Sequence, residues 1–306
     1  MLRRLFDSPA TYFVTAVILL LVALTTQFEL RIPSRRSGTV ADLTALKDRD
    51  DLNVMFLLID TLRADHMSLY GYERQTTPVI DDLSSHGIVF DRVISQSSWT
   101  KTSMASIWTG TYPATNGILR YNHAVPEAAM MPAEIFQAAG YRTAGIWRNG
   151  WVAPNFGFQQ GFDTYHQPRP GADSRLQRHS PAPRPIAGTD EDVADSVRDF
   201  LDNFGQEKFF LYVHMMDLHQ YVFDEFAPDF GPTYADAYDK SINWEDRVIG
   251  ALVQALDDHD VLQRTLIVIV SDHGEAFREH GWEGHARDLY REAVEVPFMI
   301  IPPFIL

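Results

Sequence analysis

Short apolar runs alternate with helical patterns through most of this chain, and no other feature constrains the fold as strongly. The apolar runs are NVMFLLI, IVFDRVI, RTAGIW, FFLYVHM and TLIVIVS, beginning at residues 53, 88, 142, 209 and 265. Helical patterns lie between them, at about 78–85, from about 102, at 191–204 and at 234–257. Such alternation favours parallel strand pairing with helices on both faces of the sheet. The sequence therefore predicts an α/β fold: a three-layer α/β/α sandwich with a mostly parallel central sheet.

Composition excludes several classes of function. The 306 residues are 45% apolar and 12% aromatic, which suits one large domain better than two small ones. A formal net charge of −15 argues against nucleic acid as a partner, because nucleic-acid binding depends on Lys and Arg that neutralise phosphates. The chain has no cysteine, so a disulfide, a thiolate metal site and a cysteine nucleophile are all impossible.

The first 30 residues predict a membrane anchor. Residues 8–28 carry no charge and contain AVILLLVAL, a segment just long enough to cross a bilayer. A cleaved signal peptide is the alternative, but no A-x-A cleavage site is evident, so we favour a single retained span at 1–30. Arginines on both sides of the segment leave its orientation open.

Residues 31–51 are polar and predict a linker, which places the catalytic domain at 52–306. The chain closes on VPFMIIPPFIL, an apolar ending without a polar tail. We expect the natural domain to continue beyond Leu306, so that this domain is truncated at its C-terminus. The stretch 166–189 is rich in Pro, Gly, Ser and Arg and predicts a surface loop.

Polar residues follow several of the predicted strands. Asp60 and Thr61 end the first run, and Asp272 and His273 follow the last. Other strand ends carry Arg148, Asn149, His214, Asp217 and His219. Ligands of an open parallel sheet bind at the carboxyl ends of its strands, so these side chains are the candidates for a site. One carboxylate there often only caps the next helix, whereas two carboxylates with a histidine suit a divalent metal ion: zinc, manganese or, less well, calcium.

Ordered motifs resemble a known family. The segment NVMFLLIDTLRADHMSLYGYERQTTPVIDDLSSHGIVFDRV is similar to the opening of sulfatases and of the related lipid-linked phosphoethanolamine and phosphoglycerol transferases. The segments SSWTKTSMASIWTGTYPATNGI and SDHGEAFREHGWEGHARDLYREAVEVPFMI resemble their nucleophile loop and late metal-binding segment. The likeness extends from Asn53 to Ile301, and it implies an alkaline phosphatase-like fold.

The resemblance also implies roles for single residues. Asp60, Asp272 and His273 stand at the family's metal-ligand positions. His285 stands at the family's position for a histidine that faces the substrate or a second metal, and His219 resembles another histidine that faces the substrate. We expect both histidines to be catalytic. Thr61 departs from true sulfatases, which usually have a carboxylate there, and agrees better with the transferases. For Glu275, Glu279 and His280 we expect supporting or structural roles.

Thr100 occupies the nucleophile position, where sulfatases have a Cys or Ser that is oxidised to formylglycine. Threonine cannot form that aldehyde, because its β-carbon already carries a methyl group. The resemblance instead implies a threonine alkoxide that is also a metal ligand, as in the phosphate-handling members. A plain helix N-cap is the alternative. Lys101 and Asn149 are weaker candidates for binding the anion and are as readily explained as ordinary loop residues.

These residues predict a hydrolase that cleaves anionic phosphate or sulfate esters through a covalent threonine intermediate. A membrane phosphoethanolamine or phosphoglycerol transferase is the alternative, and a non-catalytic binding module on the same fold is a third reading. Relatives with an N-terminal anchor act outside the cytoplasm, so we expect an extracytoplasmic domain. The physiological ester and the oligomeric state stay open.

Overall fold

The computed structural model describes residues 35–171, 176–178 and 187–306. Residues 35–306 form one compact unit. The anchor predicted at residues 1–30 lies outside the described residues. Within the described ranges, no helix is both long enough and apolar enough to cross a membrane.

The centre of the fold is a sheet of seven strands in the order β2-β13-β9-β1-β7-β4-β5. β1 (Asn53–Ile59) is the middle strand and pairs in parallel with β7 (Phe209–Met215) and β9 (Thr265–Val270). β4 (Arg142–Trp147) and β5 (Thr164–His166) continue the parallel part. β13 (Phe298–Ile301) runs antiparallel to both β9 and β2 (Ile88–Val89). The predicted mostly parallel sheet is confirmed.

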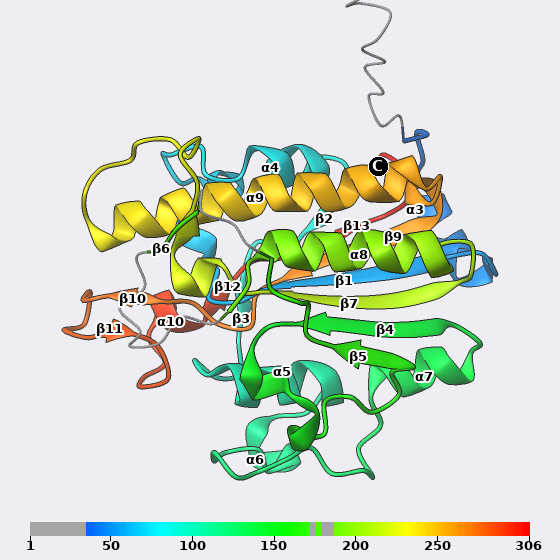
Figure 1. Cartoon of the computed structure of the whole chain (residues 1–306), viewed down its shortest axis with the longest axis horizontal. Coiled ribbons are helices and arrows are strands. Elements are labelled where there is room, and N and C mark those ends of the chain that lie inside the picture. The colour runs from blue at the N-terminus through cyan, green and yellow to red at the C-terminus, as the bar shows by residue number, and fades with distance from the viewer. Residues whose placement is uncertain (1–34, 172–175, 179–186) are drawn as a thin grey trace, which may run out of the picture. The chain divides into compact units, whose positions relative to one another are not determined.

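Helices cover both faces of this sheet, as Figure 1 shows. One face carries α4 (Pro78–Ser84), α8 (Asp190–Phe204) and α9 (Tyr234–Asp258). The other carries α5 (Thr100–Thr109), α6 (Pro113–Asn116) and α7 (Pro132–Ala138). The side chains of β1 alternate between two buried cores: Met55, Leu57 and Ile59 pack in one, and Val54 and Leu58 in the other.

Smaller elements complete the fold around the sheet. They include α10 (Arg291–Val294) and short 3-10 helices such as η4 (Gly150–Val152) and η6 (Leu218–Gln220). Antiparallel strand pairs are also present: β6 (Gln177–Arg178) with β8 (Val222–Phe223), β10 (Ala276–Phe277) with β11 (Glu283–Gly284), and β12 (Glu295–Val296) with β3 (Val93–Ile94). The predicted strand at 88–94 is thus two strands, β2 and β3, in different sheets. The polar pair Asp91 and Arg92 separates them.

Part of the segment expected to be a linker is folded onto the domain. It contains α3 (Val40–Ala45) and the 3-10 helix η1 (Leu46–Asp48). Ser37 forms a parallel bridge with Ile305, in which Gly38 N donates to Ile305 O at 2.7 Å and Ile305 N donates to Arg36 O at 2.8 Å. Phe304, whose side chain had no evident cover in the sequence, is 0% exposed. The two ends of the described chain therefore meet and bury an aromatic ring.

Candidate metal centre and nucleophile

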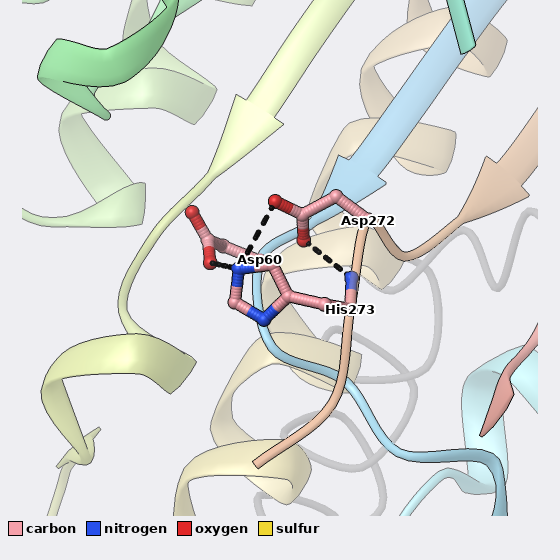
Figure 2. A group of neighbouring side chains, drawn as sticks. All are labelled: Asp60, Asp272 and His273. Carbon is pink, nitrogen blue, oxygen red and sulfur yellow. Dashed lines mark hydrogen bonds and ion pairs between the residues drawn. The ribbon is translucent and has the colours of Figure 1, made fainter. Parts of the chain in front are cut away.

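Three buried side chains converge where the two central strands end. Asp60 directly follows β1, and Asp272 and His273 follow the neighbouring strand β9 (Figure 2). One ligand atom from each residue lies within 4.8 Å of the other two. His273 Nε2 is 3.8 Å from Asp60 Oδ1 and 3.5 Å from Asp272 Oδ2. The structure thus brings together the three residues that the sequence predicted as metal ligands.

The backbone beside Asp60 adopts an unusual conformation. Thr61 has φ 64°, in the left-handed region that β-branched residues rarely occupy. Tyr238 Oη donates to Thr61 O at 2.6 Å and accepts from Arg63 N at 2.9 Å, which holds this turn against α9. The Thr61 hydroxyl donates to Asp60 O at 2.6 Å. Thr61 therefore shapes the turn that presents Asp60, and its hydroxyl is engaged with the backbone.

The donor set fits a divalent cation. Among the described residues, Asp60 Oδ1 and Asp272 Oδ2 are buried without a hydrogen-bond partner, although buried polar atoms are nearly always paired. The ion pairs of both carboxylates within this part of the chain are to histidines alone. Two carboxylates with one imidazole and unused buried oxygens form a typical donor set for a divalent metal.

The electrostatics of the three residues agree with this reading. Burial and the nearby Asp60 carboxylate raise the pKa of Asp272 well above its ordinary value, a strain that a bound cation would relieve. Burial opposes ionisation of Asp60 too, but the hydrogen bond from His214 and the neighbouring histidines bring the pKa of Asp60 below its ordinary value. Burial, with a contribution from His285, lowers the pKa of His273 to about 3. His273 is therefore a neutral imidazole at pH 7, which is the form that binds metals.

Thr100 lies beside this centre. Its Oγ1 is 3.1 Å from His273 Nε2 and accepts from Asn149 Nδ2 at 3.2 Å. Thr100 is the first residue of α5, and the N-cap position belongs to Trp99, so the alternative reading of Thr100 as a plain N-cap is wrong. Ser103 Oγ donates to Asp272 O at 2.6 Å and joins the first turn of α5 to the loop that follows β9. Free backbone N–H groups at such a helix start can bind an anion.

Asn149 connects the nucleophile position with the metal position. Its Nδ2 donates to Asp60 Oδ2 at 2.5 Å as well as to Thr100, and its Oδ1 accepts from Trp151 N at 2.9 Å. That second contact makes Asn149 the N-cap of η4, directly after β4. The amide is therefore fixed at both ends, and its nitrogen donates to Asp60 Oδ2 and to Thr100 Oγ1.

His214 is a site residue that the predicted ligand set left out. Its Nε2 is 3.1 Å from Asp60 Oδ2, and its Nδ1 is 2.7 Å from the Tyr212 hydroxyl. Both side chains come from β7 and are fully buried. The position of His214 at the end of an apolar strand was the only signal in the sequence, because its partner Asp60 lies 154 positions away.

His219 and His285 lie near the candidate metal ligands. The His285 ring is 4.5 Å from the ring of His273 and 4.9 Å from that of His219, centroid to centroid. Burial would lower the pKa of His285, but Glu275, whose Oε2 is 3.1 Å from His285 Nδ1, raises it above its ordinary value. Burial lowers the pKa of His219. The pair thus combines an imidazole that favours the protonated form with one that favours the neutral form.

The expected supporting residues have contacts of their own. Glu275 holds His285, Glu279 accepts from Arg63 Nη1 at 2.5 Å, and His280 Nδ1 is 2.6 Å from Glu292 Oε1. Two further polar residues at strand ends, Arg148 and Asp217, form a separate cluster with Asp190: Arg148 Nη1 donates to Asp190 Oδ1 at 2.8 Å and to Asp217 Oδ1 at 2.6 Å.

Lys101 is fully buried and its ammonium group is used inside the fold. It donates to Tyr121 O at 2.5 Å and to His123 O at 3.1 Å. The rings of Trp99, Trp151 and Phe156 surround it, with Nζ 5.2, 5.2 and 3.9 Å from their centroids. These contacts fix the 121–123 backbone, so Lys101 differs from the anion-binding side chain that the sequence suggested.

Comparison with known proteins shows which family and which relatives the chain is similar to. The model of a family described as Sulfatase matches residues 52–306. The chain is 24% identical over 294 residues to the ulvan-active sulfatase of Formosa agariphila, with 83% of this chain and 56% of that protein covered. It is 24% identical over 264 residues to the Kdo(2)-lipid A phosphoethanolamine 7''-transferase of Salmonella typhimurium, covering 81% of this chain and 42% of the relative.

Solved structures share the fold. The C-terminal periplasmic domain of EcEptC from Escherichia coli, in complex with Zn, superposes with a TM-score of 0.64 at 20% identity, over 83% of this chain and 73% of that chain. The chain spans about half the length of the two curated relatives, 56% and 42%.

Proposed function

This chain belongs to the sulfatase family, and on that basis we propose that it is a metal-dependent hydrolase of phosphate or sulfate esters that works through a covalent intermediate on Thr100. The observation that carries the proposal is the position of the Thr100 hydroxyl. It lies within 3.2 Å of both His273 and Asn149, at the edge of two buried carboxylates with unused oxygens.

Asp60, Asp272 and His273, with Thr100 Oγ1 as a fourth donor, would hold one divalent ion: zinc, manganese or calcium. When bound, the ion would act as a Lewis acid that lowers the pKa of the hydroxyl and stabilises charge on the attacked group. The Zn complex of the structurally similar EcEptC domain supports zinc as the first ion to test.

The side chains suggest a two-step reaction. In the first step, the Thr100 oxygen, whose proton has passed to solvent, forms a bond to phosphorus or sulfur while the bond to the leaving oxygen breaks. Protonated His285, held by Glu275, gives its proton to the leaving alcohol, and His219 lies on the same side. In the second step, water attacks the phosphorus or sulfur and gives one proton to His285. The bond to Thr100 breaks, which restores the deprotonated Thr100 oxygen for the next turnover. Asn149 donates to the Thr100 oxygen and keeps that oxygen in position.

The threonine favours phosphoryl over sulfuryl esters. Formylglycine expels sulfate through its hemiacetal, a route that a threonine ester does not have, so a threonine sulfate would need a second attack at sulfur. A membrane phosphoethanolamine or phosphoglycerol transferase is the second candidate. It is supported by the likeness to the Salmonella transferase, and it requires an acceptor alcohol in place of water in the second step.

A hydrolysis panel tests the proposal. Aryl phosphate, phosphodiester, phosphonate and sulfate esters are assayed with zinc, manganese and calcium, and intact mass is measured with a slow substrate. We expect turnover of phosphoryl esters and a phosphoryl adduct on the wild-type chain. A protein that retains stoichiometric metal but gives neither turnover nor adduct contradicts catalysis, and one that retains no metal favours the binding-module alternative.

We further propose that residues 8–28 anchor the protein and that the catalytic domain lies outside the cytoplasm. The uncharged length of that segment and the described periplasmic domain of EcEptC support this. Reporter fusions after Leu306 test it: activity from a reporter that works only in the cytoplasm would contradict the assignment.

A further inference from the structure

A cavity of about 570 Å³ lies between the residues that flank the nucleophile and the proposed acid. Its lining consists of Trp99, Leu119, Arg120, Tyr121, Asn122 and Ala286. Trp99 immediately precedes Thr100, and Ala286 immediately follows His285. Ala286 N donates to Ser98 O at 2.7 Å, which ties the two segments together on this side of the site. The residues next to Thr100 and His285 in the chain therefore both line this cavity.

Aromatic rings form one wall of the cavity. The Trp99 and Tyr121 centroids are 5.3 Å apart, and each ring also lies within 5.5 Å of Trp151. Tyr121 is nevertheless 73% exposed, so most of its ring surface is open to a ligand. Large aromatic rings that stay exposed beside a catalytic centre are typical of surfaces that pack against a ligand.

Lys101 holds the Tyr121 part of this wall in place. Lys101 donates to the backbone carbonyls of Tyr121 and His123, so the segment that carries Tyr121 is attached to α5, the helix that begins with Thr100. A rigid placement of the ring lowers the entropic cost of binding.

The charge of the lining is also distinctive. The chain carries a net charge of −15, yet the lining residues include an arginine and no carboxylate. Arg120 and Asn122 are exposed and offer polar contacts at the rim. An anionic ester would thus meet a locally favourable surface on an otherwise acidic protein.

Building on the proposed function, we propose that this cavity binds the leaving group and selects esters whose alcohol carries a ring. The flat face of the ring, aromatic or sugar, packs on Tyr121 and Trp99, while the ester group reaches Thr100. Esters of short linear alcohols leave this aromatic wall unused.

The experiment compares three substrates, 4-nitrophenyl phosphate, glucose 6-phosphate and butyl phosphate, on wild-type protein and on Tyr121→Ala. Each variant is compared with wild type on the same substrate, which removes differences in intrinsic reactivity. We expect Tyr121→Ala to lower kcat/KM about five- to tenfold on an ester with a ring, mainly through KM, and less than twofold on butyl phosphate. The two ring substrates separate an aryl from a sugar preference. Tyr121→Phe, which keeps the ring, restores the wild-type values.

Tyr112→Ala is the matched control, because Tyr112 is an equally exposed tyrosine at 68% that does not line the cavity. It leaves all three substrates unchanged. Equal effects of Tyr121→Ala on ring and linear esters, or no effect on any of them, would overturn the proposal.

A binding measurement separates this inference from the proposed chemistry. Zinc-loaded Thr100→Ala is titrated with phenyl phosphate and with butyl phosphate, in the presence and absence of Tyr121→Ala. Tighter binding of phenyl phosphate that depends on Tyr121 supports the cavity even in a protein without turnover. Equal binding of both ligands, in a wild-type protein that does turn over esters, rejects the cavity and leaves the proposed function intact.

Discussion

Two buried acidic clusters lie at the same edge of the sheet, and they differ in where their positive charge comes from. The metal cluster (Asp60, Asp272 and His273) contains two carboxylates and no cationic side chain. The arginine cluster (Arg148, Asp190, Asp217 and Glu245) carries its own cation, which bonds to two of its carboxylates.

Hydrogen bonds show part of the same contrast, at Asp217. In the arginine cluster, Asp217 Oδ2 accepts from Trp244 Nε1 at 2.9 Å and from Asp190 N at 2.8 Å. In the metal cluster, one oxygen of each carboxylate has no partner among the described residues. Buried acids are thus no evidence of a metal site by themselves. The distinguishing feature is the absent internal cation, because Glu245 Oε2 in the arginine cluster also has no hydrogen-bond partner among the described residues.

The largest expected effect is at the nucleophile. Thr100→Ala should remove nearly all turnover, on the order of 10⁶-fold where a nucleophile acts within a coupled unit, because no oxygen remains to attack. Thr100→Ser keeps the hydroxyl and should retain measurable activity. Steady-state kinetics measure the loss, and intact mass should show the covalent adduct on wild type only. An alanine variant with close to wild-type turnover would rule out covalent catalysis by Thr100.

The next effect separates the clusters by metal content. Asp272→Ala should abolish activity and lower bound metal, because it removes a ligand. Zinc at a 100-fold excess over its Kd should raise the unfolding free energy of wild type by about 2.7 kcal/mol, and its Tm should rise accordingly. Both increases should be much smaller in Asp272→Ala. Glu279→Ala is the control, since Glu279 bonds to Arg63 and contacts no metal ligand in the structure. Full metal occupancy in Asp272→Ala would mean that the site lies elsewhere.

The arginine cluster should respond in the opposite way. Arg148→Met leaves Asp190 and Asp217 buried without their cation, and breaking a buried pair in this manner costs about 3–5 kcal/mol of unfolding free energy. Denaturant unfolding measures the loss, and elemental analysis should find metal stoichiometry unchanged in the folded fraction. Loss of metal without loss of stability would reverse the roles that we assign to the two clusters.

The smallest effect is a dependence on pH. Burial and the neighbouring Asp190 raise the pKa of Glu245 well above its ordinary 4.5. The folded state therefore holds this proton while the unfolded state releases it, so stability falls as pH rises above about 4.5, at up to about 1.4 kcal/mol per pH unit.

Glu245→Gln removes the titrating carboxyl group, and its side-chain oxygen can still accept the 2.9 Å hydrogen bond from Leu218 N. The Tm of Glu245→Gln minus that of wild type should be near zero at pH 4.5 and should grow toward neutral pH. A constant difference across this range would show that Glu245 does not bind the extra proton.

Sequence patterns were sufficient for the buried strands β1, β4, β7 and β9 and for the placement of Asp60 and Asp272 at strand ends. β1 and β4 begin and end at the same residues as the apolar runs NVMFLLI and RTAGIW. Each run is buried on both faces of the sheet, and polar residues mark its ends. Asp60 and Asp272 were predictable for a related reason: parallel neighbouring strands deliver the residues at their ends to one place.

Contacts between distant loops were not predictable in this way. Lys101 follows the nucleophile and suggested an anion contact, but its ammonium meets carbonyls 20 and 22 positions later, in a loop without periodicity. Likewise, no pattern in the sequence pairs Ser37 with Ile305. Both contacts depend on the path of irregular segments, which is set by packing rather than by local sequence preference.

The bridge between Ser37 and Ile305 lies at the opposite edge of the sheet from the candidate site. Residues 35–48 lie beyond the starting end of β1, whereas Thr100 and the metal ligands lie at its finishing end, about 20 Å away at the rise of a strand (Figure 1). Residue 35, where this described part of the chain begins, therefore lies at the edge of the sheet opposite the candidate site.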